Sequence, residues 1–240
     1  MSTFTGYPSI FSGRPPQVDE ANPSHELGEL MVTADGRRFR YARANATTAL
    51  VVGNVLQSAA EDTGDQAITP EAVAVGATQL VTNSTMTVTA NQYAGGFIVV
   101  TVTPGLGQVF RIKSHAAYTA AAATFELEDP VQVALTTTSR IDFVTNPYAL
   151  VVAAPTSRTS GIVGVAVNDI SVSQYGWIQV GGYTACTNDA AGALTVGVTV
   201  MPSTSVAGSV RLATAGNPVV GEVATGIASG ETGTVNLSIS

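Results

Sequence analysis

Short apolar runs of strand length recur along most of the chain. They occupy residues 50–56, 79–82, 85–89, 97–103, 108–113, 124–128, 131–135, 141–144, 149–153, 162–167, 175–180, 183–187, 194–200, 209–213, 219–225 and 235–239. Turn-forming pairs such as Gly95-Gly96 and Asp129-Pro130 separate nearly all of them. Many short strands at this spacing are typical of all-β sandwiches and barrels. We therefore predict an all-β protein with small β-barrel or sandwich domains. Only residues 114–123 could form a helical turn or two, with an alanine-rich loop as the alternative.

A β-hairpin is predicted around Asp35-Gly36. Apolar residues 30–32 precede this pair, and Phe39 and Tyr41 alternate with arginines after it. An Asp-Gly pair between two such runs favours a type I′ turn, which needs positive φ at both central residues. The hairpin also carries the densest positive cluster among the ten Lys and Arg residues of the chain: Arg37, Arg38, Arg40 and Arg43. This cluster is either a solvated face or a contact for an acidic partner surface.

Residues 1–26 predict an extended N-terminal arm. Their prolines at positions 8, 15, 16 and 23 disfavour both helix and central strand. The segment is nevertheless rich in large apolar residues, whereas tails that stay solvated are usually poor in aromatics. We expect the arm to dock on a partner surface, with a disordered tail as the alternative. The predicted contact residues are Phe4, Tyr7, Ile10, Phe11 and Arg14.

Two linker-like stretches suggest a discontinuous domain. Residues 61–65 are acidic and contain Gly64, and residues 155–160 are rich in Ser and Thr. They bracket residues 61–155, which we predict to be an inserted β domain. Residues 27–60 and 156–240 would then form one β-barrel domain, in which residues 48–57 pair with strands from residues 160–240.

The composition indicates a weakly charged surface. Hydrophobic residues make up 45% of the chain but charged residues only 11%, about half the usual share. Such a surface favours packing against other proteins. Because aromatic residues amount to only 6%, a small supply for a large monomer core, we predict a homo-oligomer, most simply a trimer.

The charge balance and the first residues limit the classes of partner. The net charge of −7 and the isoelectric point near 4.7 argue against binding nucleic acid, since that affinity comes from neutralising phosphates with Lys and Arg. Residues 1–13 do not read as a signal peptide or a membrane span. We therefore expect synthesis in a cytosol, with neither nucleic acid nor membrane as a partner.

No recognised catalytic motif occurs in the sequence. It has no Gly-x-Ser-x-Gly elbow, no Walker loop, no dinucleotide-binding glycine pattern and no His-Glu-x-x-His. His25 and His115 are too isolated to suggest a metal site, and Cys186 is expected to be a small buried hydrophobe. We predict a protein that is not an enzyme and needs no metal or cofactor.

Three weaker patterns have both a chemical and a structural interpretation. Glu126 and Glu128 could be paired carboxylates, but alternation with Phe125 and Leu127 favours a solvated strand face. The acidic residues at 61, 62 and 65 could hold calcium, but they lack the spacing of a calcium loop. Aromatic residues could form a sugar-stacking platform, although a lone Trp in a strand is more often a core or interface anchor. These aromatic residues are Tyr175, Trp177 and Tyr183.

Several segments resemble a known family. Residues 48–56, 162–166, 175–180 and 219–224 combine apolar alternation with placed glycines, and they resemble small barrel proteins that decorate tailed-phage capsids, the decoration or cement proteins. Residues 91–96, 108–114 and 146–148 resemble an insert of virion structural proteins from environmental phages. The likeness spans most of residues 45–240, and its motifs include no catalytic signature.

The resemblance implies a structural virion protein. Such a protein binds the outer surface of the capsid and stabilises it by bridging major capsid protein subunits, often as a homotrimer. It would be made in the host cytoplasm and located on the outer capsid surface of the virion, with the arm contacting the capsid or a sister subunit. The alternative is a tail or baseplate component, or a virion protein that binds host carbohydrate. An enzyme such as a polysaccharide hydrolase is a third hypothesis.

Overall fold

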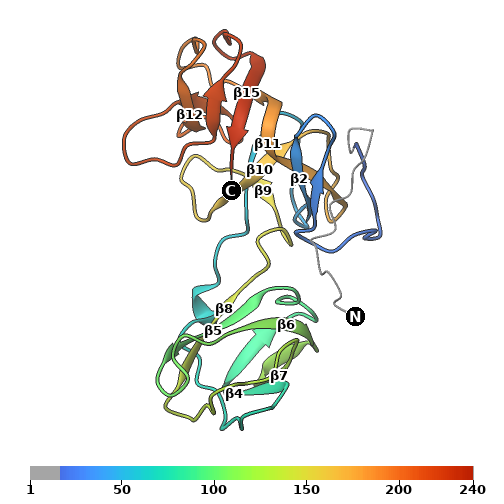
Figure 1. Cartoon of the computed structure of the whole chain (residues 1–240), viewed down its shortest axis with the longest axis vertical. Helices are drawn as coiled ribbons and strands as arrows, with labels where there is room; N and C mark the ends of the chain where they lie inside the picture. The colour runs from blue at the N-terminus through green and yellow to red at the C-terminus, as the bar shows by residue number, and fades with distance from the viewer. Residues whose placement is uncertain (1–16, 240) are drawn as a thin grey trace, which may run out of the picture. The chain divides into compact units, whose positions relative to one another are not determined.

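The computed structural model describes residues 17–239, and within them it is an all-β protein, as predicted. The chain divides into two compact units (Figure 1). Unit 1 contains the described parts of Met1–Ala60 and Pro147–Ser240, and unit 2 is Glu61–Asn146. Each unit contains one antiparallel sheet that curls on itself.

The sheet of unit 1 has ten strands. They are β1 (Leu30–Val32), β2 (Arg38–Arg43), β3 (Val55–Gln57), β9 (Val152–Ala153), β10 (Ile162–Ala166), β11 (Tyr175–Thr187), β12 (Thr199–Pro202), β13 (Val210–Leu212), β14 (Gly221–Val223) and β15 (Thr232–Ser238). The main path runs β13-β12-β14-β15-β11-β10-β3-β9, and the β1-β2 hairpin joins it through β11. The expected pairing of residues 48–57 with a strand from residues 160–240 is confirmed, because β3 pairs with β10.

Backbone hydrogen bonds connect the two ends of this path. The Val55 amide of β3 donates to the Gly208 carbonyl at 2.7 Å, and the Gly208 amide donates to Ala154 at 2.8 Å. Gly208 lies just before β13, so the sheet curls around its own apolar interior. That interior is dominated by valine and isoleucine: Val55, Val165, Val180, Val200, Val210, Val220, Val223, Ile227, Val235 and Ile239.

Three details of unit 1 differ from the sequence expectations. Residues 147–155, which we placed in the inserted domain, belong to unit 1, where β9 pairs with β3 and Val151 is buried. The runs at 175–180 and 183–187 are one continuous strand, β11. The hairpin at Asp35-Gly36 forms, but its turn spans Thr33–Gly36 and only Gly36 has positive φ, at 83°. This is the three-residue loop with a left-handed glycine rather than the expected type I′ turn.

Unit 2 begins with a 3₁₀ turn, η1 (Thr63–Asp65), followed by β4 (Gln79–Val88), β5 (Phe97–Val102), β6 (Val109–His115), β7 (Tyr118–Leu127) and β8 (Arg140–Val144). The sheet order is β4-β7-β6-β5-β8. Residues 114–123 form no helical turn: residues 114–115 end β6, residues 116–117 connect the strands, and residues 118–123 begin β7. Alanine is a weak strand former, but pairing with β4 decides its conformation here.

A short segment before β4 closes the sheet of unit 2. Ile68 bridges to Ile141 of β8, which is one edge of the sheet, and Pro70 bridges to Thr82 of β4, the other edge. Ile68 and Val73 are buried in the unit's core with residues from all five strands. The segment therefore covers two edges that would otherwise expose unpaired backbone groups.

We expect unit 2 to fold by itself and to need this segment. A fragment of residues 61–146 should unfold in one cooperative transition in urea, monitored by circular dichroism. A matched fragment of residues 76–146, which lacks Ile68, Pro70 and Val73, should show no such transition. Equal cooperativity in the two fragments would contradict the closing role of the segment.

Candidate functional site

Strand β11 changes partners near its middle. Its first part, from Tyr175 to Gly181, pairs with β2, and its second part, from Gly181 to Thr187, pairs with β15. Two adjacent glycines permit this change. A Cβ on Gly181 would lie 2.6 Å from Nε of Arg38, and Gly182 has a φ of 84°, which side chains other than glycine rarely adopt.

A buried glutamine holds the strand at this point. Gln179 is 1% exposed, and its Nε2 donates to the carbonyl oxygens of Gly181 and Tyr183, each at 3.0 Å. The Gln179 side chain therefore supplies a donor to two backbone carbonyls at the point where β11 changes from β2 to β15. A register shift between Gln179 and Gly181 marks the same place in the ladder with β2.

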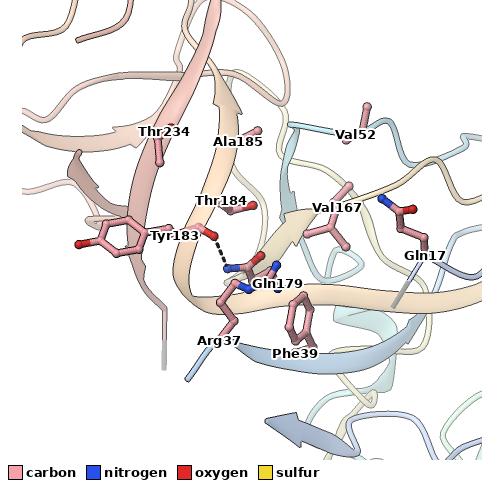
Figure 2. A pocket seen from close by; sticks show the side chains of 11 residues that line it. Gln17, Arg37, Phe39, Val52, Val167, Gln179, Tyr183, Thr184, Ala185 and Thr234 are labelled. Carbon is pink, nitrogen blue, oxygen red and sulfur yellow. Dashed lines mark hydrogen bonds between the residues drawn. The ribbon is translucent and has the colours of Figure 1, made fainter. Parts of the chain in front are cut away.

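A pocket of about 370 Å³ lies beside this bend (Figure 2). Segments far apart in the sequence line it: Gln17, Arg37, Phe39, Val52, Ala166, Val167, Gln179, Tyr183, Thr184, Ala185 and Thr234. Buried Phe39 contributes to its wall, whereas Val52 and Tyr183 are 48% and 62% exposed. The pocket thus combines apolar walls with a few polar groups, a combination common in sites that bind a ligand or a partner side chain.

The charge at the pocket is partly neutralised. Arg37 Nε lies 2.8 Å from Oδ2 of Asp35, and its guanidinium lies 5.6 Å from the centroid of the Phe39 ring. A hydrogen bond from Thr33, followed by the interactions with Arg37, lowers the pKa of Asp35. Because Asp35 stays ionised beside Arg37, the pocket suits a neutral apolar group better than an anion.

The four arginines of the hairpin do not form one free positive patch. Arg40 donates to the Gly28 carbonyl at 2.8 Å, and Arg43 donates to the Ser173 carbonyl at 3.2 Å. Both also lie against tyrosine rings of the same unit. Arg38 is exposed and lies over Gly181. An acidic partner surface would therefore meet mainly Arg38, and this contact stays a prediction.

The predicted arm residues Phe4, Tyr7, Ile10, Phe11 and Arg14 lie outside the described residues. The part of the arm that the structure does describe lies against unit 1. Glu20 forms a two-way backbone bridge with Tyr175 of β11, at 2.9 and 2.8 Å. Asn168 donates to the Val18 carbonyl at 3.0 Å, and the Ser171 hydroxyl donates to Asp19 at 2.7 Å. We expected docking on a partner surface and did not predict these contacts within the same chain, since polar pairs between distant segments leave no local pattern.

The aromatic residues do not form a sugar-stacking platform. Trp177 is 4% exposed and packs with Met31, Phe39 and Tyr41, which confirms its interpretation as an anchor within a core. Its neighbour Tyr41 donates to the Glu20 carboxylate at 2.6 Å. Tyr183 lies on the far side of the bend, at the pocket, and is not a member of this cluster.

The other chemical candidates have structural roles. Phe125 and Leu127 are buried while Glu128 is exposed, so the carboxylates lie on the outer strand face as predicted. Buried Asp65 accepts a hydrogen bond from the Tyr93 hydroxyl. Burial raises the pKa of the Cys186 thiol to about 12, which disfavours the reactive thiolate. Within residues 17–239, no three His, Cys, Asp or Glu side chains gather as metal ligands would.

His115 is held as a neutral imidazole inside unit 2. Its Nε2 accepts a hydrogen bond from the Tyr93 amide at 3.0 Å, and Nδ1 lies 2.8 Å from the Ala116 carbonyl. Protonation would put a hydrogen on Nε2 where it now accepts one. Burial, which disfavours the charged imidazolium, lowers the pKa of His115 below its usual 6.5.

Neither a family model nor a curated protein matches this chain. In the part of the chain that the structure describes, no helix has the length and apolar character needed to cross a membrane.

Replacing Gln179 with Met should weaken unit 1. The variant keeps a similar side-chain shape but removes the Nε2 donor from the carbonyls of Gly181 and Tyr183. We expect the free energy of unfolding to fall by about 1–3 kcal/mol, measured by denaturant titration. The control Gln174→Met, at a partly exposed position close to β11, should stay within about 0.5 kcal/mol of the parent protein. Equal effects of the two substitutions would show that Gln179 does not hold the bend.

Unit 2 should lose stability on acidification because of His115. Its pKa is lower in the folded state than in the unfolded state. Its contribution to stability is therefore present above about pH 6.5 and is lost as the pH falls through the folded-state pKa. His115→Gln should reduce this acid sensitivity, measured from urea midpoints, whereas His25→Gln in unit 1 should leave it unchanged. The pKa of Asp65 is raised chiefly by burial, so its contribution to the stability of unit 2 increases as the pH falls. The effect of His115→Gln is therefore also measured in an Asp65→Asn background.

Proposed function

We propose that this chain is a structural virion protein that binds the outside of a tailed-phage capsid and bridges its major capsid protein subunits. The observation that carries the proposal is the pocket at the β11 bend, which offers apolar walls at a rigid point of unit 1. It lies where the described chain begins, at Gln17. The segment that precedes Gln17 is rich in apolar residues.

Exposed apolar side chains elsewhere support a contact function. In unit 2, Phe97 pairs with Val144 across neighbouring strands, and these side chains are 37% and 45% exposed. On the next strand Val109 is 55% exposed and pairs with Val99. The outer face of β5, β6 and β8 therefore combines exposed apolar side chains with charged neighbours such as Arg111 and Asp142, a mixed surface that suits contact with another protein.

The physical effect of such a protein is mass action. A protein that binds only the assembled shell stabilises the shell by its binding free energy, because rupture must also break its contacts. The net charge of −7 suits a location outside the genome compartment, since a negative surface is repelled by nucleic acid phosphates. Self-association as a homotrimer would multiply the contacts that each bound unit makes.

Purified particles that contain this chain provide the test. We expect its copy number, from gel densitometry, to be comparable to that of the major shell protein. Particles depleted of the chain should rupture at a lower temperature, and adding the purified protein back should restore the parent rupture temperature. Bovine serum albumin at the same concentration serves as the control for unspecific protection.

Two outcomes would contradict the proposal. A copy number far below that of the shell protein would favour the tail or baseplate alternative. Unchanged rupture after depletion would show that the chain does not stabilise the shell, whatever its location.

A further inference from the structure

The pocket at the β11 bend leaves apolar surface uncovered. Val52 is 48% exposed there, and Ala185 is exposed on the strand beside it. Phe39 and Val167 complete the apolar wall. An apolar side chain placed in the pocket would remove its own surface and the exposed surface of Val52 and Ala185 from water, which is favourable.

The chain itself contains a suitable occupant. Residues 1–16 include Phe4, Tyr7, Ile10 and Phe11, and they join the described chain at Gln17, which lines the pocket. The volume of about 370 Å³ has room for one large side chain together with part of its neighbours. Arg37, neutralised by Asp35 at 2.8 Å, would border an aromatic ring in a position suited to a cation–π contact.

The distance from Gln17 bears on whose segment reaches the pocket. Pro15 and Pro16 immediately precede Gln17 and favour an extended backbone of about 3.1 Å per residue. Phe11, six positions before Gln17, would then lie up to about 19 Å away from it. A sphere of the pocket's volume, about 370 Å³, is only about 9 Å across. In that conformation Phe11 would lie beyond its own pocket, which would leave it available to the pocket of a second copy.

We propose that this pocket binds the N-terminal segment, residues 1–16, of a second copy of the chain, with Phe11 or Ile10 as the inserted side chain. The inference rests on the proposed function, which includes a homo-oligomer. It assigns the arm to a sister subunit rather than to the capsid. Each copy would donate one segment and accept another, so the exchange can close into a symmetric oligomer.

Cysteine cross-linking tests the proposal on the full chain. The only native cysteine, Cys186, is fully buried, so introduced cysteines dominate the reaction. Phe11→Cys combined with Tyr183→Cys, at the exposed pocket residue, should give disulfide-linked multimers on mild oxidation, seen on non-reducing gels. The pair Ile10→Cys and Tyr183→Cys covers the neighbouring insertion position. The matched control combines Phe11→Cys with Val196→Cys, which is 66% exposed and lies outside the pocket; it should stay uncross-linked.

A second measurement does not depend on disulfide geometry. Ala185→Arg places a large charged side chain in the pocket at an exposed strand position, whereas Ala190→Arg makes the same change at an exposed position outside it. Sedimentation should show the dissociation constant of the oligomer rising at least about tenfold for Ala185→Arg. Deletion of residues 2–16 should have the same effect, and Ala190→Arg should have none. Circular dichroism verifies that each variant is folded.

The outcomes separate this inference from the proposed function. A disulfide confined within single chains would assign the pocket to the chain's own segment and overturn the inference. Unchanged association of both Ala185→Arg and the deletion variant would also overturn it. If either result occurs while the parent protein still restores the rupture temperature of depleted particles, the proposed function stands without the exchange. If the exchange occurs but shells are not stabilised, the proposed function fails alone.

Discussion

The architecture of unit 1 depends on the path of one strand. β11 pairs with β2 along its first part and with β15 along its second part, so it must change partners without leaving buried backbone groups unpaired. Gly181 and Gly182 make the change sterically possible, and Gln179 satisfies the two carbonyls beside it. The pocket at the bend follows from the same constraint, because the strands that diverge there leave Val52 and Tyr183 exposed beside buried Phe39.

The way unit 2 is inserted follows from the pairing of two short strands. Gln57 at the end of β3 lies opposite Val152 at the start of β9. The chain therefore leaves unit 1 and returns to it at neighbouring points. A module placed in such a connection does not disturb the ladder of the host, because no strand of the host has to lengthen or shift. Unit 2 in turn closes its own sheet through Ile68 and Pro70.

These features fit a protein that works through its surfaces. His115 and Asp65 are side chains of types that catalyse reactions, but both form hydrogen bonds inside unit 2. Cys186 is buried. By contrast, apolar side chains such as Tyr183, Val109 and Phe97 remain exposed. The docked residues 18–20 place the start of the described chain beside the pocket. This arrangement supports a contact role for the bend and for the segment that precedes it.

The sequence by itself determined the local features. Alternation of apolar and polar residues predicted an all-β fold and the burial of Phe125 and Leu127. The pair Asp35-Gly36 predicted the hairpin. Alternation is a property of neighbouring residues, so it can be read without knowing the fold. Alternation left the role of Trp177 open, and the interpretation as an anchor came from the usual role of a lone Trp in a strand.

Only the tertiary structure decided the rest. Residues 118–123 became part of β7 because β4 supplies their partners, against the weak strand preference of alanine. Residues 147–155 joined unit 1 because β9 pairs with β3. The pocket combines Gln17, Gln179 and Thr234, which no spacing in the sequence relates. Pairing partners and strand bends depend on residues far apart in the chain, and local patterns carry no record of them.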